Sequence, residues 1–348
     1  MKKQIAFSLV LVLMLSLLAG CAGTAVVYLN DCTCPTAPTP TIPVNPPAEG
    51  AMKTGLAIVT SVGKSINATC AEYDVTLVAV TVDNNGVIEQ CIIDSIGTKI
   101  EFDGSGALTK VPESIATKNE LGDSYGMINA SSIKKEWYQQ AAALADYAEG
   151  KTIDQLKHGD ITNGKATEGS DLASSATIYL GGYVSAIEVA VNNAKHLGAM
   201  AGDELRLAAI PSTSSSVGAT ISKAGNAQLD VDVTALTVKD GKITSCCIDS
   251  VQAQVTFDSN GDISSDISAP VKTKNELGES YGMVAWSGAK HEWNVQAANF
   301  AAYVTGKTAD EVAGIAVGEG TKPTDADLSA GVTIAIGGFQ ALIAKAMK

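Results

Sequence analysis

The apolar residues of the chain form two kinds of pattern, and each kind occurs twice. Runs rich in Val, Ile and Leu stand on either side of the turn sequences Asp83-Asn84-Asn85-Gly86 and Lys239-Asp240-Gly241-Lys242. The runs span 75–82, 87–93, 229–238 and 243–248. Apolar runs that flank such a turn predict antiparallel hairpins. A further strand is expected to end at Phe102 and again at Phe257, where turn residues follow.

Downstream of each set of strands, the apolar spacing changes to that of a helix. Apolar residues recur three and four positions apart in two series: Ile133, Trp137, Ala141, Leu144 and Ala148; and Ala289, Trp293, Ala297, Phe300 and Val304. This spacing predicts an amphipathic helix that ends at Gly150 in the first series and at Gly306 in the second.

A short strand and a last helix complete each series. The strands are expected at 176–180 and 332–336, and the helices, after a Gly-Gly pair, at 183–194 and 339–347. Because strands come first and helices follow, the pattern predicts an α+β fold. It consists of two tandem repeats, each an antiparallel β meander followed by helices, a short strand and a C-terminal helix.

The repetition extends to individual residues. The stretch Thr117 to Met127 returns almost unchanged at Thr273 to Met283, 156 positions later. We therefore expect one repeat domain at 52–196, a linker at 197–210 and a second repeat domain at 211–348. The sequence leaves open whether the two domains pack together or move on the linker.

The N-terminus has the pattern of an exported lipoprotein. Lys2 and Lys3 precede an apolar run over 5–18, and Leu18-Ala19-Gly20-Cys21 follows. This pattern predicts a signal peptide at 1–20 and lipidation of Cys21, with the alternative of an uncleaved anchor or a spare cysteine. Both interpretations place the bulk of the protein outside the cytoplasmic membrane, attached to it in the first case through lipid on Cys21.

The residues after Cys21 have the composition of a spacer. Six prolines fall within 35–47, among Thr, Ala, Val and Asn. Such a segment favours extended polyproline geometry and cannot build a core. We therefore expect the lipidated cysteine and a Pro-rich stalk at 21–51. Cys32 and Cys34 in this stalk would either pair between molecules or remain idle thiols.

Charge and cysteine content narrow the range of partners. The formal net charge is −13, and removal of Lys2 and Lys3 with the leader makes it −15. An acidic surface disfavours nucleic acid and anionic lipid as partners. The chain has three histidines and no Cys-x-x-Cys pair, so a zinc site or c-type haem is not expected. Cys91 and Cys246 occupy equivalent positions in apolar strands, which favours buried thiols over a redox role.

Catalytic motifs do not stand out. No Gly-x-Ser-x-Gly elbow, Walker phosphate loop or His-Glu-x-x-His helix is present. The pairs Glu136/Glu292 and Glu120/Glu276 recur and are candidates for acid–base chemistry. The first pair, beside Lys134 or Lys290, is more typical of a solvated helix face, and the second lies in a loop. A hydrolase is therefore the weakest of the function classes, although enzyme activity is left open.

One motif does suggest chemistry. Asp171-Leu172-Ala173-Ser174-Ser175-Ala176-Thr177 and Asp327-Leu328-Ser329-Ala330-Gly331-Val332-Thr333 occupy the same place in the two repeats. They resemble the attachment motif of the FMN-binding domain family, in which Asp, two variable residues, Ser or Thr, Gly, Ala and a final Thr or Ser lead to a phosphodiester bond with FMN. The motif departs from that pattern at Ser175, Ala330 and Val332.

The resemblance implies a cofactor and partners. FMN would be bound covalently through Thr177, Thr333 or both, by a flavin transferase, while Asp171 and Asp327 would orient a metal or that enzyme. Ser174 and Gly331 belong to the same motif. The family resemblance further implies an exported electron carrier that exchanges electrons with a membrane redox partner.

Aromatic and thioether side chains are candidates to cover the flavin ring. Tyr125, Tyr281, Met127 and Met283 lie in the repeated loop between sheet and helix, where a site wall and simple packing are equally plausible roles. Trp137 and Trp293 lie on the apolar helical stripe and are expected in the core. The function hypotheses are thus a lipid-anchored flavin carrier and a non-enzymatic surface binding or structural module without cofactor.

Overall fold

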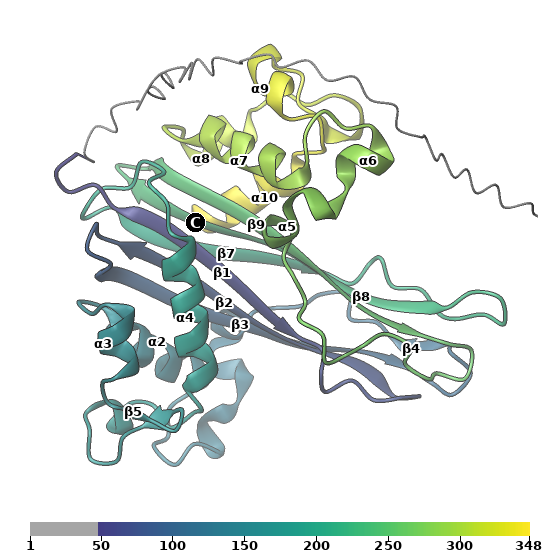
Figure 1. The fold of residues 1–348 in the computed structure, drawn as a ribbon, viewed down its shortest axis with the longest axis horizontal. Coiled ribbons are helices and arrows are strands. Elements are labelled where there is room, and N and C mark those ends of the chain that lie inside the picture. Colours follow the sequence, from purple (N-terminus) through teal and green to yellow (C-terminus); the bar gives the residue numbers. More distant parts are fainter. Residues whose placement is uncertain (1–47) are drawn as a thin grey trace, which may run out of the picture. The chain divides into compact units, whose positions relative to one another are not determined.

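Two antiparallel β-sheets lie at the centre of the structure, a computed structural model that describes residues 48–348 (Figure 1). The predicted signal peptide, Cys21, Cys32, Cys34 and the stalk as far as Pro47 lie outside the described residues. The part from Pro47 to Lys348 is one compact unit. The prediction of a mixed α+β fold with antiparallel sheets is confirmed.

The first sheet has the strand order β1-β2-β3-β4, and the second has the order β7-β8-β9. The strands are β1 (Lys53–Ser61), β2 (Cys70–Val82), β3 (Ile88–Phe102), β4 (Leu108–Lys110), β7 (Glu204–Ser212), β8 (Gly225–Lys239) and β9 (Lys242–Phe257). A separate two-stranded sheet joins β5 (Ile161–Thr162) to β6 (Lys165–Ala166). The hairpins β2–β3 and β8–β9 form around the turn sequences that predicted them.

The α-helices are α1 (Lys118–Leu121), α2 (Trp137–Ala148), α3 (Ile153–Lys157), α4 (Gly181–Asn193), α5 (Lys274–Leu277), α6 (Met283–Ser287), α7 (Trp293–Val304), α8 (Ala309–Ala313), α9 (Ala326–Gly331) and α10 (Gly337–Ala346). Short 3₁₀ turns are η1 (Gly122–Tyr125), η2 (Met127–Asn129), η3 (Leu172–Ser174), η4 (Gly278–Tyr281) and η5 (Glu319–Thr321). None of the helices within 48–348 is long and apolar enough to span a membrane.

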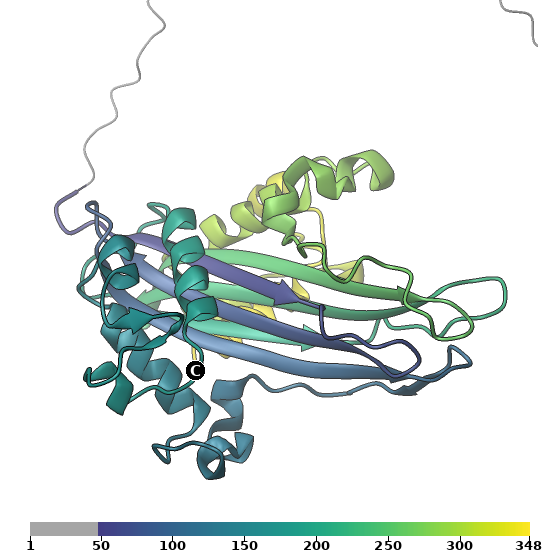
Figure 2. The ribbon, with the colours of Figure 1, turned by 60° about the horizontal axis from the view of Figure 1, so that its bottom comes forward.

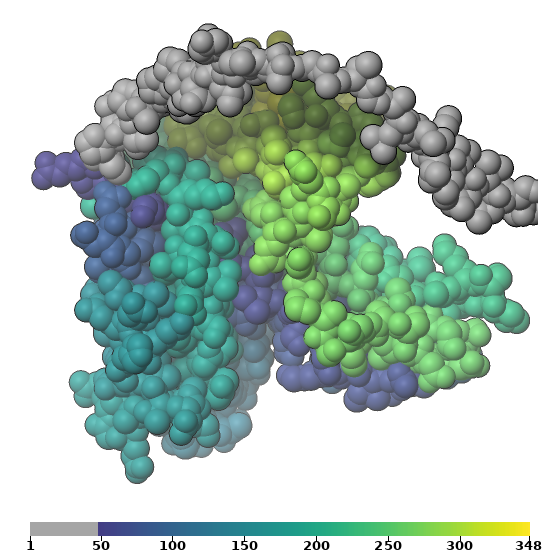
Figure 3. All heavy atoms as spheres, in the orientation of Figure 1, coloured from purple at the N-terminus to yellow at the C-terminus, as the bar shows by residue number. Residues whose placement is uncertain are grey.

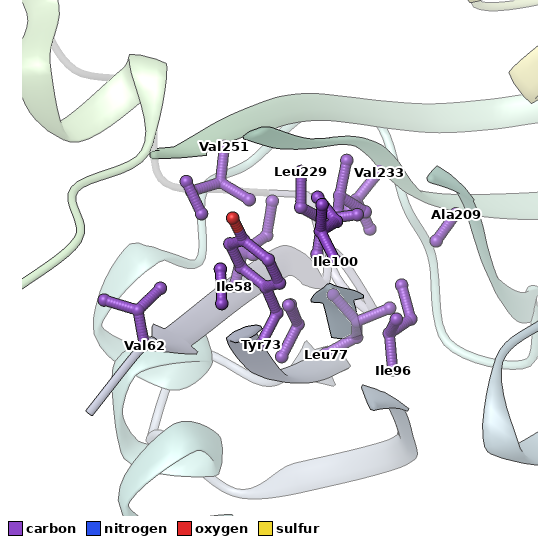
Figure 4. Packing of buried hydrophobic residues seen from close by; sticks show 14 of the residues in the cluster. Ile58, Val62, Tyr73, Leu77, Ile96, Ile100, Ala209, Leu229, Val233 and Val251 are labelled. Carbon is purple, nitrogen blue, oxygen red and sulfur yellow. The ribbon is translucent and has the colours of Figure 1, made fainter. Parts of the chain in front are cut away.

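The sheets pack face to face through one shared apolar cluster, which we call the central core (Figure 4). It combines Tyr73, Leu77, Ile96 and Ile100 of the first sheet with residues of the second sheet such as Leu229. The Tyr73 hydroxyl donates to the carbonyl of Ala227 at 2.8 Å. The rings of Phe102 and Phe257 stack with centroids 4.0 Å apart. The halves 48–196 and 197–348 therefore share one core, in addition to the cluster that each half forms under its own helices.

Helices cover the outer face of each sheet (Figures 1 and 2). On the first sheet, α2 and α4 pack on the other side of β1 to β3, and on the second sheet α7 and α10 do the same. Both faces of the long strands are thus buried. Buried strands of this kind have nearly continuous apolar sequences, as the run over 75–82 has.

Three sequence expectations were wrong. The segment 197–210, expected to be a linker, contains most of β7, because its apolar residues Leu205 and Ala209 join the central core. The short strands expected at 176–180 and 332–336 do not form, since the side chains of Gln140 and Gln296 take their backbone N–H groups. The Gly-Gly pairs begin the last helices instead of preceding them.

Helix α4 contacts β1 closely at Gly55. A Cβ atom at this position would lie 2.1 Å from the carbonyl oxygen of Ala190. Gly55 therefore permits backbone-to-backbone contact between the helix and the edge strand, which holds α4 in place beside β1.

We predict that Gly55→Ala destabilises the protein by about 1–3 kcal/mol, because the new methyl group forces α4 away from the sheet. Urea unfolding measured by circular dichroism tests this. Gly97→Ala in β3 is the matched control, since a Cβ atom added there would have no other atom within 4 Å. Equal stability of the two variants would contradict the close contact.

Candidate functional site

The repeated sequence Thr-Lys-Asn-Glu-Leu-Gly forms the same hydrogen-bonded turn in both halves. Thr117 is the N-cap of α1, where its hydroxyl accepts from the N–H of Glu120 and the Glu120 carboxylate accepts from the N–H of Thr117. Thr273 and Glu276 form the same capping box at α5. Each capping box satisfies two N–H groups that the helix leaves free. The Glu120/Glu276 pair thus has a structural role in each half.

The asparagines of this sequence attach the turn to the sheet. The Asn119 side chain donates to the carbonyl of Ile93, and Asn275 donates to that of Ile248, both at 3.0 Å. Their N–H groups donate to the carboxylates of Asp94 and Asp249, again at 3.0 Å. This explains why the sequence is kept almost letter for letter.

The lysine of the repeated sequence was not among the predicted site residues. Lys118 Nζ lies 4.9 Å from the ring centroid of Trp137 and 5.2 Å from that of Tyr125. Lys274 lies 4.8 Å from Trp293 and 5.3 Å from Tyr281. Both are cation–π contacts. Burial lowers the pKa of Lys274, against the opposing effect of Asp232, Asp230 and Asp249.

The predicted wall residues lie around this lysine. Tyr125 is 39% exposed, whereas the Tyr281 hydroxyl donates to the side chain of Gln252 at 2.9 Å. Both contact the lysine of their own half. Met127 and Met283 are half-buried and pack at the edge of the helix-covered clusters.

The next loop is held by a carboxylate. Glu136 accepts from the N–H groups of Met127 and Ile128, each at 2.8 Å, and Glu292 does the same for Met283 and Val284. Glu136 is 2% exposed, so the expectation of a solvated helix face was wrong. It binds backbone at the start of α2. Trp137 and Trp293 are buried, which confirms their prediction as core residues.

The two candidate attachment threonines share one arrangement. The Gln140 side-chain oxygen accepts from the Thr177 N–H at 2.8 Å, the Thr177 hydroxyl at 3.2 Å and the Ile178 N–H at 3.2 Å. Gln296 accepts from Thr333 and Ile334 at 2.7, 3.2 and 3.2 Å. Both glutamines are fully buried, whereas both threonines are exposed. Each threonine is thus an exposed residue whose backbone and hydroxyl are both held by a buried glutamine.

The glutamines were missed because an amide on an apolar helix face has no distinctive sequence pattern. Their one signal is that they recur 156 positions apart. Gln296 also brings two predicted site residues together, since its Nε2 lies 3.5 Å from the sulfur of Met283. In the first half, the Gln140 amide donates to the Ser131 hydroxyl in place of a sulfur. Both amides also donate to the carbonyl five positions earlier, that of Lys135 or His291.

The remaining motif residues lie beside the threonines. Asp171 and Asp327 are exposed, and the Ser174 hydroxyl donates to the Asp171 carbonyl. At Gly331, a Cβ atom would lie 2.7 Å from the Asn299 side chain, which donates to the Gly331 carbonyl. In the first half, the motif has Ser175 in place of glycine, and the helix residue of α2 that corresponds to Asn299 is the smaller Ala143.

Cys91 and Cys246 are buried, as predicted, whereas the neighbouring Cys247 is half-buried. Burial raises the pKa of the Cys91 thiol and raises that of Cys246 to about 12. Both groups are protonated at neutral pH, which disfavours nucleophilic or redox chemistry. Within 48–348, no group of three or more His, Cys, Asp and Glu side chains is placed to hold a metal ion.

A cleft of about 700 Å³ lies between the two halves. Helix α4 and the segment that follows it form one wall, and helices α5 and α7 form the other. Strands β1 and β9 form the floor. Figure 3 shows the teal atoms of α4 facing the green atoms that follow β9. A cleft of this size is typical of small-molecule sites.

Comparison with known proteins gives no relative: no protein-family model, no curated protein and no solved structure matches the chain.

Asp249 contributes a titratable group to the cleft. Its carboxylate accepts from the N–H groups of Ser250 and Asn275 at 2.7 and 3.0 Å. Burial nevertheless raises its pKa from 3.8 to about 6. The folded state therefore favours the protonated carboxyl. The contribution of Asp249 to the free energy of unfolding is fully present below pH ~4 and is lost as the pH rises through about 6.

We predict that Asp249→Asn removes this pH dependence. Between pH 4 and pH 8, the free energy of unfolding of the variant should rise relative to the unmodified protein by up to about 3 kcal/mol, the equivalent of two pKa units. Urea unfolding at several pH values measures the difference. Asp240→Asn, on the exposed β8–β9 turn, is the control. A constant difference between Asp249→Asn and the unmodified protein would show that burial does not raise this pKa.

Proposed function

We propose that the chain consists of two copies of one folding unit, held outside the cytoplasmic membrane by lipid on Cys21. The matched hydrogen bonds support two copies: the capping boxes, the asparagine contacts and the glutamine–threonine pairs recur at equivalent positions. The leader pattern supports the anchor.

We further propose that each unit is an FMN-binding-like domain that holds FMN covalently through Thr177 or Thr333. The observation that carries this proposal is an exposed threonine held by a buried glutamine, repeated with nearly the same distances in both halves. A transferase needs an acceptor that is both accessible and fixed, because positioning supplies much of the rate of a group transfer.

The residues present fit such an attachment. The Thr177 or Thr333 oxygen would form a bond to the phosphorus of a flavin dinucleotide, the nucleoside monophosphate would leave, and the hydroxyl proton would pass to the transferase. Gln140 or Gln296 would keep the loop in place, since its contacts to the two backbone N–H groups do not involve that proton. Bound FMN would supply electron transfer to a membrane redox partner.

The surroundings of the two threonines differ in ways that favour Thr333. The second half keeps the motif's glycine at Gly331, and Asn299 holds its carbonyl. Met283 adjoins Gln296, so a thioether lies near this hydroxyl. Trp286 on α6 is 76% exposed and adds apolar surface to the same half, whereas Ile128 and Val284 are exposed to nearly the same extent, at 42% and 41%. A planar apolar ring is stabilised by such contacts.

The alternative is a surface binding module that keeps the fold without cofactor. The cleft between the halves favours this alternative, because it provides a concave site that does not involve either threonine. The two functions are compatible within one chain, since Gln296 does not line the cleft, although Asn299 of α7 lines the cleft and also contacts Gly331.

Protein produced in a host that expresses a flavin transferase should carry flavin. We expect flavin absorption and a mass increase of FMN less water for each modified threonine, measured on the intact protein. Thr333→Val should remove most of the increment and Thr177→Val with Thr333→Val all of it. Valine keeps the shape and the backbone hydrogen bonds, so folding is retained.

Thr220→Val, in an exposed loop outside the motif, is the matched control and should keep the increment. Colourless protein of unmodified mass from the same host would exclude the flavin proposal and leave the binding module.

A further inference from the structure

The cleft between the halves has a counterpart on the other side of the molecule. The two sheets meet at β1 and β9 and again at β3 and β7. At the first meeting α4 and α7 line the cleft from opposite sides, and at the second α10 contacts α1 through Lys345 and Glu120. Along the helices and the repeated loop, positions 156 residues apart correspond, so that Val189 of α4 corresponds to Lys345 of α10, and Glu120 corresponds to Glu276.

At the β3–β7 side, a lysine of the chain itself connects the two walls. Lys345 on α10 forms an ion pair with Glu120 of α1. Its ammonium also donates to the carbonyl of Ala209 in β7 at 2.7 Å. The aliphatic stem lies between these groups and the helix. The space between α10, α1 and β7 therefore holds an alkyl chain that ends in a primary ammonium.

At the β1–β9 side, the acceptors are kept and the lysine is replaced. Glu276 faces the cleft, and within 48–348 it makes no ion pair. Ile58 corresponds to Ala209 by strand register, since Leu77 and Val233 are their partners in β2 and β8. Val189 stands where Lys345 would be, and its shorter side chain leaves the space open.

The backbone of β1 presents a second acceptor. In an antiparallel edge strand, the N–H and C=O groups of alternate residues point away from the partner strand. The Thr54 N–H and C=O groups bond to the backbone of Lys195, and the Leu56 carbonyl accepts from the Asn193 side chain. The carbonyl of Ile58, two residues further on, points the same way and lines the cleft.

Asn294 of α7 also lines the cleft. The side-chain oxygen of Asn294 is buried and has no hydrogen-bond partner among the described residues. A buried acceptor without a donor costs free energy, and a ligand with N–H groups can supply the donor. Between these acceptors the cleft is apolar, with Leu56, Ile58, Ile248 and Val295 among its lining residues.

We propose that this cleft binds a molecule with an aliphatic stem and a terminal primary ammonium, which takes the place that Lys345 occupies at the opposite side. The ammonium pairs with Glu276 and donates to the Ile58 carbonyl, and the stem lies against Val189. A free alkylamine and a lysine side chain of a peptide share this chemistry. Neither threonine lines the cleft, although Asn299 both lines it and donates to the Gly331 carbonyl of the second motif.

Binding can be tested with the chain from residue 22 onward, which contains the whole compact unit. The probe is n-hexylamine at pH 7.5, compared with hexanol and hexanoate by isothermal titration calorimetry. We expect hexylamine to bind at least about tenfold more tightly than either, the effect of one charged contact. Equal binding of hexanol, tighter binding of hexanoate at Lys195 and His196 on the opposite rim, or no binding would overturn the proposal.

Two variants locate the site. Glu276→Gln should weaken hexylamine binding about tenfold, because it removes the charge but keeps the cap of α5. Val189→Lys should abolish binding, since it places the chain's own lysine in the cleft as Lys345 is placed at the other side. Glu120→Gln, at the other side, is the matched control and should leave binding unchanged. Unaltered binding in Val189→Lys would also overturn the proposal.

A second probe identifies the source of the ammonium. N-acetyl-lysine amide presents the same group as a lysine within a peptide. If it binds as hexylamine does, the cleft accepts lysine side chains of peptides. If only hexylamine binds, the cleft selects free amines. Both results support the ammonium site.

Discussion

The packing of the two sheets against each other is the interaction on which the rest of the structure depends. Each sheet buries one face against its own helices and the other against the second sheet. If the halves separated, the central core would be exposed to water, at a cost roughly proportional to its apolar area. The strands that line the cleft, β1 and β9, are adjacent because of this packing. A binding site between the halves is therefore a consequence of the central core.

The sequence predicted much of the local structure because local signals determine it. The turns at 83–86 and 239–242, the amphipathic helices that contain Trp137 and Trp293, and the buried cysteines all follow from short-range pattern. The sequence did not predict that the halves share a core. An apolar strand that is buried on both faces has the same sequence whether its second face meets a helix or another sheet. For the same reason the sequence predicted a linker where β7 lies.

The candidate sites show the same limit. The repeated loop could be found from sequence because it recurs almost letter for letter, and the threonines because Asp, Leu and Thr recur at the same spacing. Gln140 and Gln296, which hold the threonines, lie far from them in the chain, and only the fold brings them together. The cleft has no sequence signal at all. It arises from a difference between equivalent positions, where Val189 stands in one half and Lys345 in the other.

The shared core can be tested by asking whether one half senses damage to the other. In a Trp286→Phe/Trp293→Phe background, Trp137 is the remaining tryptophan and reports on the first half. Phe300→Leu, a buried change under α7, should lower the stability of the second half by about 1 kcal/mol. If the halves form one cooperative unit, the urea midpoint of Trp137 fluorescence falls together with that of circular dichroism. A Trp137 midpoint that does not move would contradict the account.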